Sequence, residues 1–534
     1  MAANLRRTTV LVLGLTLVVN ALNYLRDAGL AARFGASPAS DAIFSALLLP
    51  AILQQMLVAG TLAPAVVPVY LEMAGHSPTQ ARRLIWQVLL SVAVGLIPLA
   101  VLAVFLTPAL VNLLFPGFDA ATQAMTVQAL RFFWPGAVCL ILAGLTGSLL
   151  NAADHFVLPA LTPGLGSALA LMVLWLRPAV SVPELALALA LAMAMQLLLH
   201  LPGLWTAGRN PRILPAPADG MNPAVRSVRF APARPLRRVL MLSLPLFAYV
   251  SLSQIMTLIE RVFASHLGAG AVARLTLAQK LASLPLFLVA GSLAVVIFPR
   301  LAALQMNRAD FSAALASGLR SALPLLLLAT AWLMSGSQLL VTLLYQHGLF
   351  SAQDGAQTAI LVQGYALGLT PAGLGVILLK ALHARQDVRS PLWVAAVSLT
   401  CYLALAAPGS RLWGALGLAL ALSTTALIST SLLALILVRR HQALAWRPLL
   451  RDLAGLLPAT AAALAAGWLA EVWLQPALGD GLPALLLRLL ILILVGGGAF
   501  AILARGAGFV RGDPRSWLEP RRPARAPPVS QAEV

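Results

Sequence analysis

Long apolar runs, separated by short polar or basic connections, occupy most of this chain. A run of about 18 or more apolar residues predicts a helix that spans a membrane. We identify about fourteen candidate spans from this pattern, a few of them shorter. They cover residues 8–34, 41–72, 84–106, 125–150, 156–176, 184–205, 240–263, 272–299, 313–344, 356–382, 391–405, 412–438, 453–469 and 485–503. The pattern therefore predicts an all-α polytopic membrane protein.

The composition and the charge agree with this class. Hydrophobic residues make up 60% of the chain and charged residues only 10%, whereas a soluble domain has about 25% charged residues. The net charge is +19. The arginines lie mostly between the apolar runs, which favours contact with membrane lipids and a role in topology over nucleic-acid binding.

Basic connections alternate with connections that contain no Lys or Arg, such as residues 115–122, 346–354 and 471–481. Because positive residues stay on the cytoplasmic side, both termini are expected to be cytoplasmic. A connection rich in Pro and Arg divides the chain. We expect an N-terminal lobe at 1–206, a basic linker at 207–238, a C-terminal lobe at 239–440, two further helices at 441–505, and a disordered basic tail at 506–534.

The two halves repeat. Residues 58–63, Val-Ala-Gly-Thr-Leu-Ala, match residues 289–294, Val-Ala-Gly-Ser-Leu-Ala, and residues 34–36 match residues 267–269. The same alignment places Asp27 opposite Glu260. Both repeats start on the same side, so they are parallel, an arrangement that in transporters places the substrate between two bundles.

Polar side chains recur at helical spacing within the first and seventh runs. Thr16, Asn20, Asn23 and Asp27 share one face, as do Ser253, Thr257 and Glu260. A charge at the bilayer centre costs roughly 2.5–3.5 kcal/mol, so such residues usually face a wet cavity. Lys280 lies well inside its run. Together with the arginines it predicts a pocket for an anion such as a diphosphate.

Structural roles for the same charges stay open. Arg33, Arg274 and Arg320 lie near helix ends, where long side chains reach the interface. The pairs Arg26–Asp27 and Glu260–Arg261 are alternatively salt bridges between helices.

The residues do not indicate an enzyme. The chain has no His-Glu-x-x-His, no phosphate-binding loop with Lys-Ser/Thr and no Gly-x-Ser-x-Gly. We therefore expect no catalytic residue, metal or cofactor. Uphill transport would depend on an ion gradient or on the membrane potential.

Several segments of the chain form a recognisable set. They are Leu25-Arg26-Asp27, residues 32–36, Ser40-Asp41-Ala42-Ile43-Phe44, Leu49-Pro50, and residues 60–68, with residues 264–265, 278–281 and 298–301 in the second half. Together these segments resemble the MurJ/MviN lipid II flippases. The resemblance covers essentially the whole chain. It implies two six-helix lobes that rock by alternating access, and two C-terminal helices that form a lipid-facing groove.

The resemblance also implies a location and a cargo. The location is the bacterial inner membrane. The cargo is lipid II, the undecaprenyl-diphosphate-linked peptidoglycan precursor, which passes from the inner to the outer leaflet. Cell-wall synthesis proteins are the expected partners.

Arg26, Asp27 and Asp41 match charged positions of the family, whereas Lys280 stands where an Arg is usual and Gln279 replaces an Asp. Leu48 replaces an Arg, and Gln54 and Gln55 replace an Arg pair. We expect the cargo to be bound by Arg26, Arg33, Gln54, Gln55, Arg261, Arg274 and Lys280. Asp27, Asp41 and Glu260 are expected to orient these cations or gate the lobes.

The departures leave three alternatives. One is an exporter of another polyprenyl-linked oligosaccharide, of the exopolysaccharide or O-antigen type. Another is a drug/cation antiporter, which would depend on cavity acids. The last is a membrane scaffold that does not transport.

Overall fold

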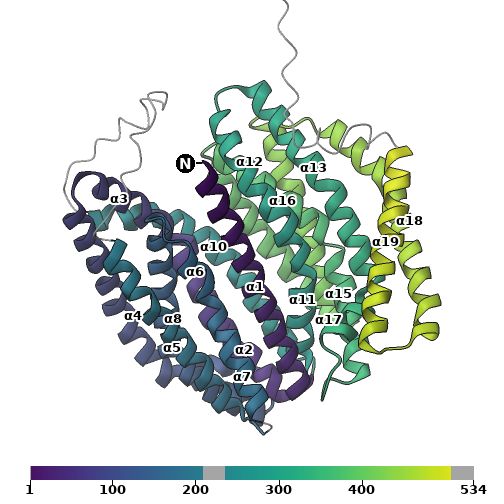
Figure 1. Ribbon diagram of the computed structural model, residues 1–534, viewed down its shortest axis with the longest axis horizontal. Helices are drawn as coiled ribbons and strands as arrows, with labels where there is room; N and C mark the ends of the chain where they lie inside the picture. Colours follow the sequence, from purple (N-terminus) through teal and green to yellow (C-terminus); the bar gives the residue numbers. More distant parts are fainter. Residues whose placement is uncertain (1, 178, 208–234, 507–534) are drawn as a thin grey trace, which may run out of the picture. The chain divides into compact units, whose positions relative to one another are not determined.

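The computed structural model describes residues 2–177, 179–207 and 235–506, and the elements it describes are all helices (Figure 1). The first half contains α1 (Ala2–Phe34), α2 (Pro38–Gln54), the π-helix η1 (Gln55–Leu62), α3 (Ala63–His76), α4 (Pro78–Leu114), α5 (Ala120–Ala152), α6 (Val157–Leu161), α7 (Pro163–Leu176) and α8 (Val182–Ala207). The second half contains α10 (Pro235–Ser265), α11 (Ala271–Pro285), the π-helix η2 (Leu286–Gly291), α12 (Ser292–Ala303), α13 (Arg308–Ser335), α14 (Ser337–Leu344), α15 (Ala352–Ala366), α16 (Leu369–Ala384), α17 (Arg389–Arg439), α18 (Trp446–Leu478) and α19 (Leu482–Gly506).

Local sequence explains where several of these helices begin. Pro38, Pro78 and Pro163 stand in the first turn of their helices, where proline loses no hydrogen bond. The Asp119 side chain accepts the Thr122 N–H at the start of α5. The Asn307 side chain accepts two backbone N–H groups at the start of α13. Such caps satisfy donors that have no partner within the helix.

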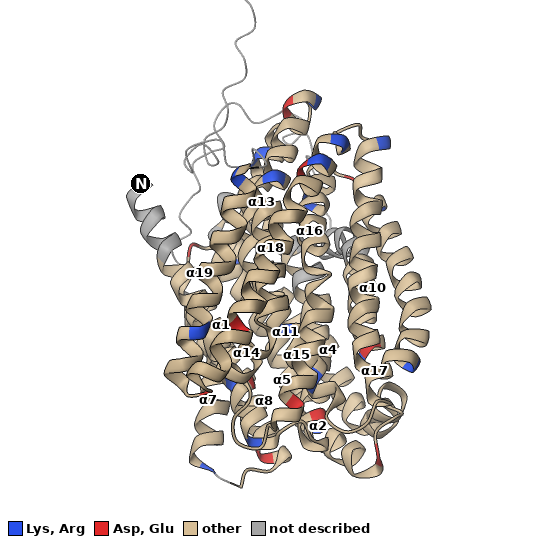
Figure 2. Cartoon of the chain, turned by 90° about the vertical axis from the view of Figure 1, so that its right-hand side faces the viewer, with Lys and Arg blue, Asp and Glu red and all other residues tan. Residues whose placement is uncertain are grey.

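The helices are long and apolar enough for a membrane. Among the described residues, eleven meet this criterion, or twelve if α15 and α16, which are bent by 43°, form one span. The sequence predicted about fourteen spans. The difference lies in α10, which contains the predicted span 240–263 but is not among the twelve, and in α17, which counts once although it contains 391–405 and 412–438. Figure 2 shows long uncharged stretches along these helices. The expected class, an all-helical polytopic membrane protein, is confirmed.

The two predicted spans within α17 are joined by a tight turn. Gly414 has a φ of 56° and interrupts the helical backbone. A Cβ added at Gly417 would lie 1.9 Å from the Gly409 carbonyl oxygen. Only glycine fits there, because the two arms of α17 approach each other at backbone distance.

The internal repeat appears in the backbone. Each half has a π-helix, η1 or η2, after a proline-containing helix. The sequence match of Val58 with Val289 aligns the first residue of η1, Gln55, with the first residue of η2, Leu286. π-Helices are rare and often lie at functional sites, so their occurrence at matched positions supports the repeat.

The chain forms two compact units. Unit 1 comprises the described parts of residues 1–283, 340–368 and 386–433, and unit 2 those of residues 284–339, 369–385 and 434–506. In unit 1, α5 packs against α2, α4 and α8. In unit 2, α18 packs along α19 and against α13. The predicted boundaries at 206, 238 and 440 stay predictions. Of the predicted linker, residues 208–234 lie outside the described residues, as do residues 507–534 of the predicted tail.

Candidate functional site

A buried carboxylate with two cationic partners forms the centre of the candidate site in unit 1. Asp27 of α1 is only 1% exposed. Its Oδ1 accepts hydrogen bonds from Arg26 Nη2 at 2.9 Å and Nε at 3.1 Å. Its Oδ2 accepts one from Lys280 Nζ of α11. Each carboxylate oxygen is thus occupied by a different cation, and the ion pair with Lys280 joins the first repeat to the second.

Further contacts hold Lys280 in place. The Tyr24 hydroxyl, one turn before Asp27, donates a hydrogen bond of 2.9 Å to the Lys280 carbonyl oxygen. The Lys280 ammonium lies 5.7 Å from the centre of the Phe44 ring, within the range of a cation–π interaction. Three contacts from α1 and α2, with Asp27, Tyr24 and Phe44, therefore fix one lysine. Its side chain stays 36% exposed, so the ammonium can also face a ligand.

A cavity of about 330 Å³ opens beside this cluster. Three cations line it, Arg26, Arg261 and Lys280. The other lining residues come from α2, α5, α7, α8 and α11, and are Phe44, Leu47, Leu48, Ala51, Gln54, Leu140, Pro163, Gly166, Leu189, Ala192, Met193, Gln196 and Thr276. Apolar walls with a few convergent polar groups are typical of a ligand site.

Of the residues expected to bind the cargo, four line the cavity. They are Arg26, Gln54, Arg261 and Lys280. Gln54 is turned toward α5, where its Nε2 lies 3.4 Å from the Leu140 carbonyl oxygen. Such a long contact leaves the amide available to other partners. The roles of these four residues in binding remain predictions.

The other three expected binding residues do not line this cavity. Arg33 donates hydrogen bonds to the carbonyl oxygens of Leu174 and Arg177 at the end of α7, as cations do at helix C-termini. Gln55 is the exposed first residue of η1. Arg274 forms an ion pair of 3.1 Å with Asp354 of α15.

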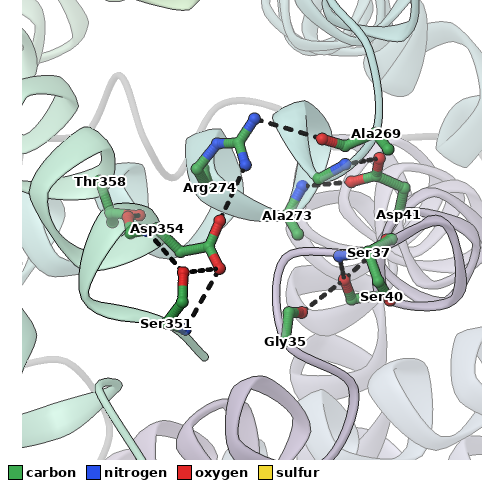
Figure 3. A network of polar contacts seen from close by, with 11 residues as sticks. Gly35, Ser37, Ser40, Asp41, Ala269, Ala273, Arg274, Ser351, Asp354 and Thr358 are labelled. Carbon is green, nitrogen blue, oxygen red and sulfur yellow. Dashed lines mark hydrogen bonds and ion pairs between the residues drawn. The ribbon is translucent and has the colours of Figure 1, made fainter. Parts of the chain in front are cut away.

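Asp41 belongs to a second polar network, in which α2, α11 and α15 meet (Figure 3). Its carboxylate accepts the backbone N–H of Gly270 at 2.6 Å and that of Ala273 at 2.7 Å. These N–H groups belong to the start of α11, so a side chain of the first repeat caps a helix of the second. Asp354, the partner of Arg274, in turn accepts a hydrogen bond from the Ser351 hydroxyl.

Glu260, the third expected acid, is buried in α10 and does not line the cavity. Its Oε1 accepts a hydrogen bond of 2.5 Å from the Tyr365 hydroxyl. The next residue, Arg261, does line the cavity, and its Nη2 donates a hydrogen bond of 3.0 Å to Gln279 Oε1. Neighbouring positions on one helix thus place an acid in the protein interior and a cation at the cavity.

Sequence reasoning missed two polar residues of the cavity, Gln196 and Thr276. Gln196 is the one amide side chain within the apolar run of α8, so the sequence could have indicated it as a candidate cavity residue. Thr276 gave no signal, because a threonine in a helix commonly bonds to its own backbone, as it does here to the Val272 carbonyl oxygen. Tyr365 was missed because a buried aromatic residue suggests packing alone.

The arrangement is suited to an anion. Three cations and two amides converge on one partly open cavity, and Asp27 compensates part of their charge. Charge-assisted hydrogen bonds from such groups to phosphate oxygens are strong. The geometry therefore indicates binding of an anionic ligand.

Comparison with known proteins identifies relatives over most of the chain. Residues 30–487 match the family described as "Lipid II flippase MurJ". The chain is 30% identical to "Lipid II flippase MurJ" of Burkholderia cenocepacia over 414 residues, which are 73% of this chain and 76% of that protein. It is 29% identical to "Probable lipid II flippase MurJ" of Rhizobium meliloti over 482 residues, covering 88% and 87% of the two chains.

Solved structures share the fold. A structure described as "Lipid II flippase MurJ, inward closed conformation" matches with a TM-score of 0.75 and 21% identity, over 93% of this chain and 99% of that chain. An inward-facing multidrug resistance transporter of the MATE family matches with a TM-score of 0.64 and 14% identity, over 81% and 98% of the two chains. At these identities the structures support the fold alone.

Proposed function

Because this chain belongs to the lipid II flippase MurJ family, we propose that it moves lipid II from the inner to the outer leaflet of the bacterial cytoplasmic membrane. The family consists of transporters, and the chain is not an enzyme. The observation that carries the proposal is the cavity lined by Arg26, Arg261 and Lys280. A diphosphate is the part of lipid II that such a cluster of cations would bind.

The residues of the cavity have different roles in this proposal. Arg26 and Lys280 bind the diphosphate oxygens, and Arg261 adds positive charge from α10. Gln54 and Gln196 donate hydrogen bonds to the phosphates or to the neighbouring sugar. Asp27 holds Arg26 and Lys280 at fixed positions, so that less conformational freedom is lost when the cargo binds.

Transport follows an alternating-access cycle. The contacts of Asp27 with Lys280 and of Asp41 with α11 join the two repeats within unit 1. Breaking and remaking them would gate the cavity. An ion gradient or the membrane potential supplies the energy. Arg33 and Arg274, which bond to α7 and α15, support the fold around the cavity, and Gln55 takes no part in binding.

The topology and the partners are part of the proposal. The alternation of basic connections supports cytoplasmic N- and C-termini. The helices α18 and α19 form the groove along which the polyprenyl chain lies. Cell-wall synthesis proteins receive the cargo on the outer side.

One observation favours a second cargo. Leu48 and Gln54 line the cavity where the family resemblance leads us to expect arginines. A cavity with fewer cations binds the diphosphate less tightly and depends more on the saccharide. The second candidate is therefore another oligosaccharide linked to polyprenyl diphosphate.

Genetic rescue tests the function. The chain is expressed in bacteria whose own lipid II flippase can be switched off, and growth and surface exposure of lipid II are measured. We expect rescue by the wild-type chain and by Arg177→Ala, which removes an exposed arginine outside the cavity. Arg26→Ala should abolish rescue at the same membrane level. A wild-type chain that is present in the membrane but fails to rescue would contradict lipid II as the cargo.

A further inference from the structure

Glu260 is a buried acid whose bonding is incomplete. It is 1% exposed. Oε1 accepts the hydrogen bond from Tyr365, whereas Oε2 is buried and has no hydrogen-bond partner among the described residues. A charged carboxylate away from water needs several donors or a close counter-charge to offset its lost hydration. A proton on Oε2 would remove that charge.

Three elements place charged or titratable groups around Glu260. Tyr365 comes from α15 and Tyr402 from α17, and Arg261 follows Glu260 in α10. The Tyr402 hydroxyl is fully buried and also has no hydrogen-bond partner among the described residues. Beyond Arg261 lie Gln279 and Lys280 of α11. Among the described residues, Arg261 is the cation that interacts electrostatically with the Glu260 carboxylate.

Arg261 connects this acid to the cavity. It is 3% exposed, yet it lines the cavity. Of its two terminal guanidinium nitrogens, Nη2 bonds to Gln279, and Nη1 is buried without a partner among the described residues. Besides Glu260, Asp41 also interacts electrostatically with Arg261. The field that Arg261 exerts in the cavity therefore depends on whether Glu260 carries a charge.

We propose that Glu260 is a proton-binding site, and that its protonation strengthens the binding of the anionic cargo by removing the negative charge next to Arg261. The inference rests on the proposed function, since it needs a diphosphate cargo in the cavity. The step is the transfer of a proton from a hydronium ion of the aqueous phase to Oε2, which leaves a water molecule. It changes the net charge of the Glu260–Arg261 pair from zero to one positive charge. The binding of the cargo and of the proton then support each other.

The surroundings favour a proton over a metal cation. A metal ion at Oε2 would lie beside the Arg261 guanidinium and be repelled by it. Besides its carboxylate, the site provides two tyrosine hydroxyl groups, Tyr365 and Tyr402, which serve a neutral carboxyl group as well as a charged one. A proton neutralises Glu260 without adding a further positive ion next to Arg261.

The test measures binding of purified lipid II to the full chain in nanodiscs of neutral phospholipid, between about pH 5.5 and about pH 8. Both phosphates of lipid II are esterified, so their charge is constant over this range. The variant Glu260→Gln keeps the shape and an oxygen acceptor for Tyr365, and it mimics the protonated acid. The matched control is Glu184→Gln, an exposed glutamate of the same unit that pairs with Arg177.

We expect wild-type binding to tighten about tenfold from alkaline to acidic pH, within the range of coupled sites. Glu260→Gln should bind at all pH values as the wild type binds in acid, and Glu184→Gln should follow the wild type. Equal pH dependence in the wild type and Glu260→Gln, or none in the wild type, would overturn the proton site. If folded wild-type protein binds no lipid II at any pH, the proposed cargo itself is wrong.

Two further measurements keep the test decisive if Glu260→Gln does not fold. Tyr365→Phe removes the hydrogen bond to Oε1 and should displace the midpoint of the pH curve. An unchanged curve would contradict the proposal. Adding sodium ions at constant pH should leave wild-type binding unchanged after correction for ionic strength by a potassium control. Specific tightening by sodium would assign the site to a metal cation instead.

Discussion

Asp27 and Lys280 lie 253 positions apart in the sequence and form an ion pair within unit 1. The two residues belong to the two halves of the internal repeat. Arg26 occupies the other oxygen of the same carboxylate. One acid thus positions two cations of the cavity. Because Asp27 is buried, its charge needs both Arg26 and Lys280 as partners, and the geometry of the cluster therefore depends on both cations.

Replacement of Lys280 tests the cluster directly. Lys280→Ala removes one cation from the cavity and one of the two partners of Asp27. The loss of a charged hydrogen bond of about 1.5–3 kcal/mol should weaken lipid II binding about tenfold to hundredfold. Lys280→Arg keeps the charge and adds a planar fork suited to phosphate, so it should retain binding. Full transport by Lys280→Ala at normal membrane levels would exclude a central role for this residue.

Gln54 and Gln55 are adjacent, but only Gln54 lines the cavity. Gln54→Ala removes an amide donor, whose hydrogen bond is worth about 0.5–1.5 kcal/mol, so the Kd for lipid II should rise about two- to tenfold. Gln55→Ala is the matched control and should leave the Kd unchanged. Titration of both purified variants with lipid II measures the effect. A larger loss of lipid II affinity in Gln55→Ala than in Gln54→Ala would mean that η1 adopts a different orientation during binding.

Asp41 caps the start of α11 with two hydrogen bonds. Asp41→Ala leaves two buried N–H groups without acceptors and should lower the free energy of unfolding by about 1–3 kcal/mol. Asp41→Asn retains one carbonyl oxygen as acceptor, so its free energy of unfolding should lie between those of the wild type and Asp41→Ala. Thermal unfolding in detergent compares both variants with the wild type. Equal unfolding temperatures for all three proteins would contradict a capping role.

Arg488 secures the hairpin of α18 and α19 in unit 2. This arginine is 2% exposed and bonds to Glu471, to Asp480, and to the Gly479 carbonyl oxygen. Arg488→Ala leaves Glu471 without its partner and should destabilise the hairpin by about 3–5 kcal/mol. Limited proteolysis at the α18–α19 turn should become faster.

A double variant tests whether the unpaired charge of Glu471 or the lost packing of Arg488 causes the faster proteolysis. Arg488→Met with Glu471→Leu removes both charges and should recover much of the lost protection, because apolar pairs can replace a buried ion pair. If the double variant is cleaved as fast as Arg488→Ala, the single variant acts through lost packing and not through an unpaired charge.

Much of the fold could be predicted from the sequence. The apolar runs located most of the long helices, and the matched segments around Val58 and Val289 located the repeat. The polar face of the first helix indicated Asp27. These signals are local, since they depend on the chemistry of neighbouring positions along one helix.

The pairing of side chains between helices could not be predicted in the same way. Arg274 bonds to Asp354, 80 positions away, and Arg33 bonds to carbonyl oxygens of α7. In the sequence, both arginines were candidates for ligand binding as well as for a structural role. The rotation of each helix about its axis decides which side chains meet, and a local pattern does not give that rotation. Tyr365 completes the environment of Glu260 for the same reason. An isolated polar residue does not reveal its partner.

The paired π-helices bear on the history of the chain. A π-helix holds one residue more per turn than an α-helix and shifts the faces of all residues that follow. The two examples, η1 and η2, begin at positions that the repeat aligns, Gln55 and Leu286. Two independent insertions at the same site are less economical than a single one. The matched positions fit a single wide turn that was copied together with the rest of the repeat.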